Sequence, residues 1–193
     1  MKICVFGAAS YEIDGKYIKA VENLGEIMAK RGHELVFGAG GNGVMGAIAR
    51  GVKNTGGKVY GVIPTFFRDE TIEAIFDNCD QLIFTETMAQ RKTKMEDLAD
   101  AFIIAPGGIG TFEEFFEVLT LKQLGRHTKP IAIFDIDGYY NKLDEFLDYC
   151  IKEKFIKDTC KQLYGFQKDP LKVIEYLEND NRNEIRVHEM KQG

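Results

Sequence analysis

The nine-residue run Pro106-Gly107-Gly108-Ile109-Gly110-Thr111-Phe112-Glu113-Glu114 constrains the fold of this chain more than any other stretch. The apolar segment Ala101–Ala105 precedes it and is typical of a strand buried in a parallel sheet. The residues after it have the apolar spacing of one helix face. Glycines between a strand and a helix let backbone N–H groups come close to an anion, which the positive end of the helix dipole also attracts. The run therefore predicts a phosphate-binding loop with a pair of carboxylates one turn inside the following helix.

The same residues also allow a purely structural interpretation. Thr111 and Glu114 have the spacing of a capping box, in which the threonine caps a helix and the glutamate reaches back to the cap. Gly107–Gly110 would then be only a tight turn between strand and helix. The residues of this run alone leave both interpretations open.

Apolar runs and helical patterns alternate along the whole chain. Strands are predicted at Lys2–Gly7, Leu35–Phe37, Lys58–Ile63, Gln81–Phe84, Ala101–Ala105 and Pro130–Phe134. Helices are predicted between these strands and after the last one, including Gly15–Lys30, Thr87–Leu98, a short one from Glu70-Thr71-Ile72 and a final one that starts at Asp169-Pro170. This order predicts an α/β fold: a single-domain, doubly wound (Rossmann-like) parallel sheet with helices on both faces. The domain is expected to span residues 1–178, and residues 179–193 are expected to form a polar C-terminal tail.

The loops that start at Gly7, Gly38, Thr85, Pro106 and Asp135 all follow predicted strands. In a parallel sheet they lie at one edge, where ligands of such folds bind, so they could build one site.

Two further patterns bear on the ligand. Gly38, Gly40 and Gly43 form a GxGxxG string, but the next strand ends in Ile63-Pro64 instead of the acidic residue that holds a ribose in dinucleotide sites. This departure argues against NAD or FAD.

Basic residues also fall in the first two turns of the helix after Thr87, where the helix dipole opposes positive charge. A nearby anionic ligand would explain them, and a solvated basic helix face is the alternative. These basic residues are Arg91, Lys92 and Lys94.

Composition excludes several classes. The 193 residues are 45% hydrophobic and carry a net charge of −5, which argues against a general nucleic-acid binder. The four cysteines stand far apart and pair with no histidine at metal-ligand spacing, so we predict reduced thiols and no metal. The three histidines, His33, His127 and His188, fall outside the predicted site loops and are expected at the surface. The chain starts directly with a strand and contains no long apolar run, so we expect a cytoplasmic protein that contacts no membrane.

The chain resembles the LOG family, the cytokinin riboside 5′-monophosphate phosphoribohydrolases, which were long labelled lysine decarboxylases. The family's central signature falls on Pro106–Glu114, its glycine loop on Gly38–Gly46 and its small-residue loop on Gly7–Ser10. Its Met-His-x-Arg-Lys string falls on Met88–Lys92, with Ala89 in place of the histidine. Its Asp-Gly-Tyr-Tyr string falls on Asp137–Tyr140.

The resemblance implies hydrolysis of the N-glycosidic bond of a nucleoside 5′-monophosphate such as AMP or isopentenyladenosine monophosphate, giving free base and ribose 5-phosphate. It implies no cofactor, and a homodimer or a larger homo-oligomer. The family's functional residues fall on Arg91 and Glu114. Its substrate contacts fall on Ser10, Gly40, Gly41, Met88, Lys92, Gly107, Gly108, Ile109, Gly110, Thr111, Phe112, Glu113 and Thr120. A carrier that binds a nucleotide or cofactor on the same fold without catalysis is the alternative, since one fold hosts many functions.

Overall fold

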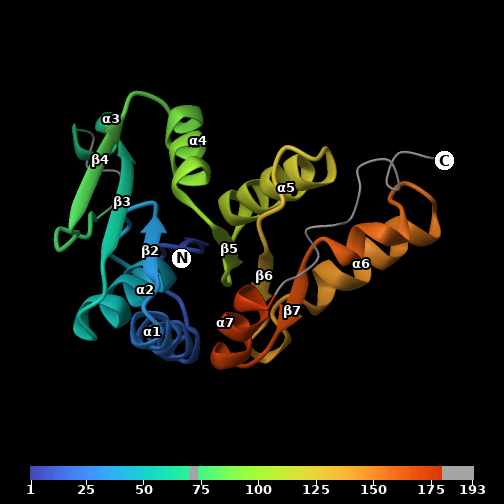
Figure 1. Ribbon diagram of the computed structural model, residues 1–193, viewed down its shortest axis with the longest axis horizontal. Coiled ribbons are helices and arrows are strands. Elements are labelled where there is room, and N and C mark those ends of the chain that lie inside the picture. Colours follow the sequence, from blue (N-terminus) through green and yellow to red (C-terminus); the bar gives the residue numbers. More distant parts are fainter. Residues whose placement is uncertain (70–73, 180–193) are drawn as a thin grey trace.

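The computed structural model describes residues 1–69 and 74–179, and it confirms the α/β fold (Figure 1). Within these residues, seven strands, all parallel, form one sheet in the order β4-β3-β2-β1-β5-β6-β7. The strand bounds are β1 Lys2–Phe6, β2 Glu34–Phe37, β3 Val59–Pro64, β4 Gln81–Thr85, β5 Ala101–Ile104, β6 Ile131–Phe134 and β7 Gly165–Gln167. Six of them match the predicted strands to within a residue or two at each end, and β7 was not predicted.

Helices cover both faces of the sheet, as the doubly wound pattern predicts (Figure 1). α1 (Gly15–Lys30), α2 (Gly43–Asn54) and α7 (Pro170–Glu178) share one hydrophobic core with the sheet. α4 (Met88–Leu98), α5 (Ile109–Gln123) and α6 (Asn141–Lys152) share the other. Short helices lie at α3 (Thr65–Asp69), η1 (Ile136–Gly138) and η2 (Asp158–Gln162). The helix predicted from Glu70 lies mostly outside the described residues, as does the predicted tail after Asn179.

α1 and α2 pack closely because Gly51 of α2 has no side chain. A Cβ at this position would overlap the backbone carbonyl oxygen of Glu22 in α1. The close approach fixes α2 against α1, and the loop that precedes α2 contributes to the site described below.

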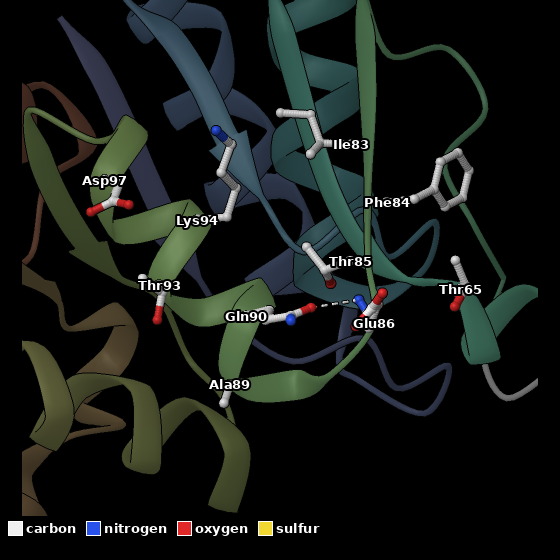
Figure 2. A pocket seen from close by; sticks show the side chains of 10 residues that line it. All are labelled: Thr65, Ile83, Phe84, Thr85, Glu86, Ala89, Gln90, Thr93, Lys94 and Asp97. Carbon is white, nitrogen blue, oxygen red and sulfur yellow. Dashed lines mark hydrogen bonds between the residues drawn. The ribbon is translucent and has the colours of Figure 1, made fainter.

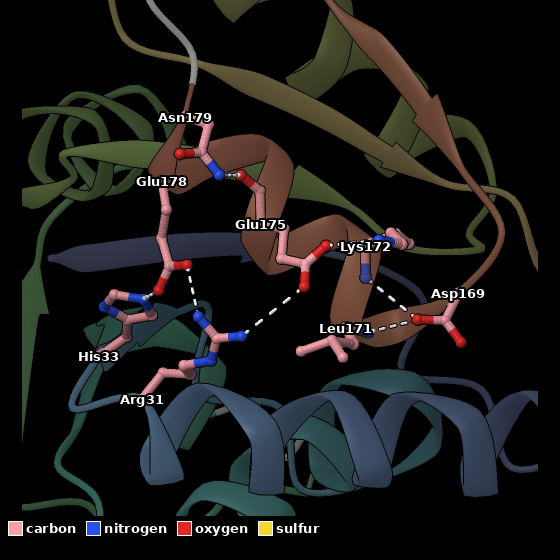
Figure 3. A network of polar contacts seen from close by, with 8 residues as sticks. All are labelled: Arg31, His33, Asp169, Leu171, Lys172, Glu175, Glu178 and Asn179. Atoms are coloured by element: carbon pink, nitrogen blue, oxygen red, sulfur yellow. Dashed lines mark hydrogen bonds and ion pairs between the residues drawn. The ribbon is translucent and has the colours of Figure 1, made fainter.

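The end of α7 is tied to the end of α1 by a polar network (Figure 3). Glu178 accepts a hydrogen bond from Arg31 Nη1 at 2.8 Å, and its other oxygen lies 2.9 Å from His33 Nε2. Asp169 caps the start of α7 by accepting from the amides of Leu171 and Lys172. His33, which immediately precedes β2, is buried. The prediction that it is a surface residue is wrong, because Glu178 at the end of α7 contacts its ring.

No helix in the described part of the chain is both long and apolar enough to cross a lipid bilayer.

Candidate active site

The candidate site lies where the order of the strands reverses. The chain runs outward from β1 through β2 and β3 to β4, and then returns to place β5 on the other side of β1. The loops after β1 and β5 therefore lead to helices on opposite faces of the sheet, α1 and α5. Ligands of open α/β sheets bind between two such loops. The amide of Ala8 in the first loop donates to the carbonyl of Pro106 in the second at 3.2 Å, so the two loops remain in contact.

A cavity of about 240 Å³ opens at this point. Its lining comes from three loops and three helices. The loops after β1, β2 and β5 therefore meet at one sheet edge as predicted, whereas the predicted loops at Thr85 and Asp135 contribute no lining residue. The lining residues are Gly7, Ala8, Ala9, Gly40, Met45, Met88, Arg91, Gly108, Gly110, Thr111 and Glu114. Arg91 comes from α4 and Glu114 from α5, so the two residues that the resemblance marks as functional face the same cavity.

Arg91 is a buried cation, with a relative exposure of 8%. Its Nη2 donates to the carbonyl of Gly38 at 3.2 Å, and its guanidinium lies 5.6 Å from the ring centre of Phe67. Its Nε is buried and has no hydrogen-bond partner among the described residues. A buried charge is costly unless it is paired and hydrogen-bonded. The guanidinium therefore retains the capacity to bind an anion.

Gly38 is the residue that makes room for this arginine. A Cβ at Gly38 would overlap Arg91 Nη2 and lie 2.7 Å from its Cζ, far inside van der Waals contact. The first glycine of the GxGxxG string thus serves the packing of an arginine against the backbone. This geometry explains the first glycine of the string without a dinucleotide.

Glu114 lies in the second turn of α5, and its side chain is half-buried. Burial raises the pKa of its carboxyl to about 7; the positive charge of Arg91 opposes the increase, and the negative charge of Glu113 adds to it. A carboxyl with a pKa near 7 can exchange a proton at neutral pH, as catalytic acids and bases must.

α5 begins with Gly108 as its N-cap, and among the described residues no side chain caps this end. Thr111 is the third residue of the helix and not its cap, so the capping-box interpretation of Thr111 and Glu114 is wrong. Gly108, Gly110 and Thr111 line the cavity at the start of α5, and the amides of a first helical turn have no acceptor within their own helix. The helix start thus offers N–H donors and a positive dipole end to an anion.

Lys92 is held away from this cavity by two glutamates of α5. Its Nζ forms ion pairs with Glu113 and, at 2.7 Å, with Glu117. Burial alone would lower the pKa of the Lys92 ammonium, but its hydrogen bonds to these carboxylates raise it to about 12. Lys92 and Glu113, both expected to contact substrate, therefore bind each other in this structure.

The other expected contact residues divide into two groups. Gly40, Met88, Gly108, Gly110 and Thr111 line the cavity. The remaining ones do not line it: Ser10, Gly41, Lys92, Gly107, Ile109, Phe112, Glu113 and Thr120. The amide of Gly41 donates to the carbonyl of Ala74, and Ile109 is 88% exposed at the start of α5. Thr120 lies three turns further along the same helix, beside a different cavity.

The Asp-Gly-Tyr-Tyr string braces the central loop and does not line the cavity. The Tyr139 hydroxyl donates to the carbonyl of Gly107 at 2.6 Å, and the Tyr140 hydroxyl donates to that of Ala105 at 2.7 Å. The Asp135 carboxylate accepts from the Tyr140 amide at 2.8 Å. Sequence reasoning matched this string to the family but assigned it no role. The pair of adjacent tyrosines after a predicted strand end is the sequence signal that could have indicated this bracing role.

Ala89, which replaces the family's histidine, lines a separate and shallower groove of about 700 Å³ between α4 and β4 (Figure 2). At the start of α4, Thr87 accepts from the Gln90 amide, and Gln90 accepts from the Glu86 amide. Thr87 and Gln90 thus form a variant of the capping box, in which the glutamine binds the amide of the residue before the cap. The cap fixes the start of α4, the helix that carries Arg91.

The fold and the cavity together define the class of this protein: an α/β protein whose ligand site lies at the switch point of a parallel sheet. Solved structures share this architecture. The molybdenum cofactor binding protein of Rippkaea orientalis is 21% identical with a TM-score of 0.70, and the match covers 92% of this chain and 94% of that one. The molybdenum cofactor carrier protein of Chlamydomonas reinhardtii is 22% identical with a TM-score of 0.69, covering 92% and 95%. At these identities the likeness shows the fold alone.

Sequence relatives are more specific. A family model described as "Possible lysine decarboxylase" matches residues 45–177. The cytokinin riboside 5′-monophosphate phosphoribohydrolase LOG2 of Arabidopsis thaliana is 37% identical over 177 residues, which are 92% of this chain and 82% of that protein. The probable phosphoribohydrolase LOGL2 of Oryza sativa subsp. japonica is 36% identical over 98% of this chain and 78% of that protein. The chain therefore belongs to the LOG family of phosphoribohydrolases, which hydrolyse N-glycosyl bonds and are not lysine decarboxylases.

Proposed function

We propose that this protein hydrolyses the N-glycosidic bond of nucleoside 5′-monophosphates, with AMP and isopentenyladenosine monophosphate as substrates to test. The products are the free base and ribose 5-phosphate. The observation that carries the proposal is the pairing of a buried, incompletely hydrogen-bonded Arg91 with a Glu114 of raised pKa in one cavity. The names of the Arabidopsis and rice relatives support the same substrate class.

The phosphate and ribose fit the cavity best. Its volume of about 240 Å³ lies below the roughly 300–1,000 Å³ of pockets that enclose a whole small molecule. The sugar phosphate therefore lies inside and the base projects toward the mouth, where Met88 is 40% exposed. The amides at the start of α5 and the guanidinium of Arg91 are the donors for the phosphate oxygens.

Glu114 serves the bond-breaking step. Departure of the base leaves positive charge on the ribose, and a carboxylate beside the sugar stabilises that charge. The ionised form also takes a proton from the attacking water as the water oxygen bonds to the ribose, and that proton passes to the departing base, so that neutral base and ribose 5-phosphate result. With its pKa near 7, Glu114 is partly ionised at neutral pH, and the positive charge of a bound sugar in the transition state favours the ionised form further.

The carrier alternative predicts binding without turnover. A carrier needs the helix start and Arg91 to hold a ligand, but it does not need a half-buried carboxyl of raised pKa in the same cavity, because this group destabilises the fold. Glu114 is thus the feature that favours the enzyme over the carrier.

We also propose that the protein acts as a homodimer or a larger homo-oligomer. Ile109 is 88% exposed at the start of α5, beside the cavity lining, and Met88 is 40% exposed at the cavity itself. A second copy that covers these side chains would remove apolar surface from water and close the cavity mouth. Sedimentation equilibrium measures the assembly, and a monomer at all concentrations would contradict this proposal.

The decisive experiment incubates the protein with AMP or isopentenyladenosine monophosphate and measures free base and ribose 5-phosphate by chromatography. Glu114→Ala and Arg91→Ala should both remain folded and lose turnover. Binding of the substrate, measured by calorimetry, should be weakened strongly in Arg91→Ala and much less in Glu114→Ala. Thr93→Ala, on the far side of α4 in the shallow groove, is the matched control and should retain full activity.

Two results would decide against hydrolysis. Tight binding of both nucleotides with no base release by the wild-type chain would favour the carrier. Release that persists in Glu114→Ala at the wild-type rate would place the chemistry elsewhere.

A further inference from the structure

A second cavity, of about 390 Å³, lies between the later turns of α5 and the chain that follows α6. It shares no lining residue with the Arg91–Glu114 cavity. Phe116 and Leu119 of α5, Leu147 of α6 and Phe155 and Ile156 of the connecting segment give it apolar walls. Its volume falls within the range of small-molecule sites.

The charged groups that line this cavity are all positive. Two lysines, Lys154 and Lys157, line it together with the uncharged Thr120 and Gln123, and no carboxylate does. The chain as a whole, in contrast, carries a net charge of −5. An apolar pocket with a few convergent polar groups is the usual form of a ligand site, and here the charged groups are all cationic.

Lys157 is the most informative residue. Its side chain is half-buried, and its Nζ is shielded from solvent without a hydrogen-bond partner among the described residues. The nearby Lys161, in contrast, forms ion pairs with both Asp144 and Asp148. An ammonium without water or a counter-ion is costly, so an anion that reaches Lys157 Nζ would offset that cost.

A backbone turn after α6 places both lysines at the cavity. Lys154 has a φ of 65°, in the left-handed region that few non-glycine residues adopt. This turn ends α6 and brings Lys154, Phe155 and Lys157 to the same cavity. Phe155 is 85% exposed, so an aromatic side chain stands at the cavity with almost no partner in the described part of the chain.

We propose that this cavity binds a small amphipathic organic anion: one carboxylate, sulfonate or phosphate group on an aromatic or aliphatic body. The acidic group pairs with Lys157 and Lys154, Thr120 and Gln123 offer hydrogen bonds, and the body packs against Phe155 and its apolar neighbours. The site does not depend on the proposed hydrolase function. It gives Thr120 a ligand other than the nucleotide.

The test uses two fluorescent probes that differ by one charged group. 8-Anilinonaphthalene-1-sulfonate carries a sulfonate, and N-phenyl-1-naphthylamine is the same aromatic body without it. The full chain should bind the sulfonate probe saturably, with one site per chain and more tightly than the uncharged probe. Lys157→Met should weaken the sulfonate probe by about 10-fold or more, as expected for a hydrogen bond to a charged group, and should leave the uncharged probe unchanged.

Lys152→Met is the matched control, since Lys152 is an exposed lysine in the last turn of α6 that does not line the cavity. It should bind both probes like the wild-type chain. Thermal unfolding with and without probe checks that each variant is folded, and the sulfonate probe should raise the melting temperature of wild type more than that of Lys157→Met.

Three outcomes would overturn the proposal. The first is equal affinity of wild type and Lys157→Met for the sulfonate probe. The second is equal affinity of the wild-type chain for both probes. The third is no saturable binding together with an oligomer that dissociates in Phe155→Asp, which would show that a second copy of the chain covers the cavity.

Discussion

Replacing Glu114 with glutamine should stabilise the protein at alkaline pH while it abolishes catalysis. The folded protein raises the pKa of this carboxyl from an ordinary value of 4.5 to about 7. Each pKa unit corresponds to about 1.4 kcal/mol, so ionised Glu114 costs the folded state about 3 kcal/mol. Glutamine keeps the size of the side chain and removes the charge, so it avoids this cost.

The pH dependence identifies the cause. Below about pH 4.5 the carboxyl is protonated in both the folded and the unfolded chain, so the charge costs nothing. As the pH rises from 4.5 to 7, the unfolded chain ionises first, and the stability of the wild type falls relative to Glu114→Gln. Above pH 7 both states are ionised and the difference stays at its full value of about 3 kcal/mol.

Urea unfolding of the two proteins at pH 4.5, 6 and 8.5 measures this difference directly. Glu153→Gln is the matched control, because Glu153 is an exposed glutamate just after α6 and does not line the cavity. It should show no gain that increases with pH. A Glu114→Gln variant that is no more stable than the wild type at pH 8.5, or whose gain is the same at all three pH values, would refute the assignment of a buried, high-pKa carboxyl.

Two further substitutions test the scaffold of the site. Gly38→Ala should displace the Arg91 guanidinium and lower kcat/KM by about 100-fold, as misplacement of a catalytic group by about 1 Å does. The control is Gly15→Ala, whose added methyl group would meet nothing within 4 Å and which should be neutral. A Gly38→Ala variant with wild-type activity would contradict the packing argument. Tyr140→Phe leaves the buried carbonyl of Ala105 without its donor and should lower the free energy of unfolding by about 1–3 kcal/mol, measured by urea unfolding; an unchanged value would show that the loop needs no brace.

The elements were predictable from sequence because each carries a local signal. The predicted bounds of α1, Gly15–Lys30, coincide with the observed ones because the apolar spacing and the following glycine both mark its extent. β7 was missed because it has only three residues, Gly165–Gln167, and all are half-buried, so no apolar run or alternation marks it. It is added to the edge of the sheet through its pairing with β6, which is a tertiary effect.

The residues of the site could be predicted from the sequence, but the contacts between their side chains could not. Arg91 and Glu114 could be placed at one sheet edge, since both follow strand ends of a parallel sheet. The ion pairs of Lys92 with Glu113 and Glu117 could not be predicted, because they depend on how α4 and α5 face each other. The capping box at Thr111 failed for a related reason. The helix begins at Ile109, three residues earlier than a cap at Thr111 would place its start, because Gly108 can serve as its cap.

The different partners of Arg91 and Lys92 explain how a ligand and a carboxyl can share the cavity. Glu113 and Glu117 neutralise Lys92, so this lysine adds little positive charge to the cavity. Arg91 is left as the principal cation there, and Glu114 faces it without enough compensation to bring its pKa back to the ordinary range. If Lys92 were free to approach Glu114, its charge would lower that pKa and fix the carboxylate in the ionised state. The two glutamates on the neighbouring turns of α5 thus keep the proton of Glu114 exchangeable near pH 7, which is the property that the proposed reaction needs.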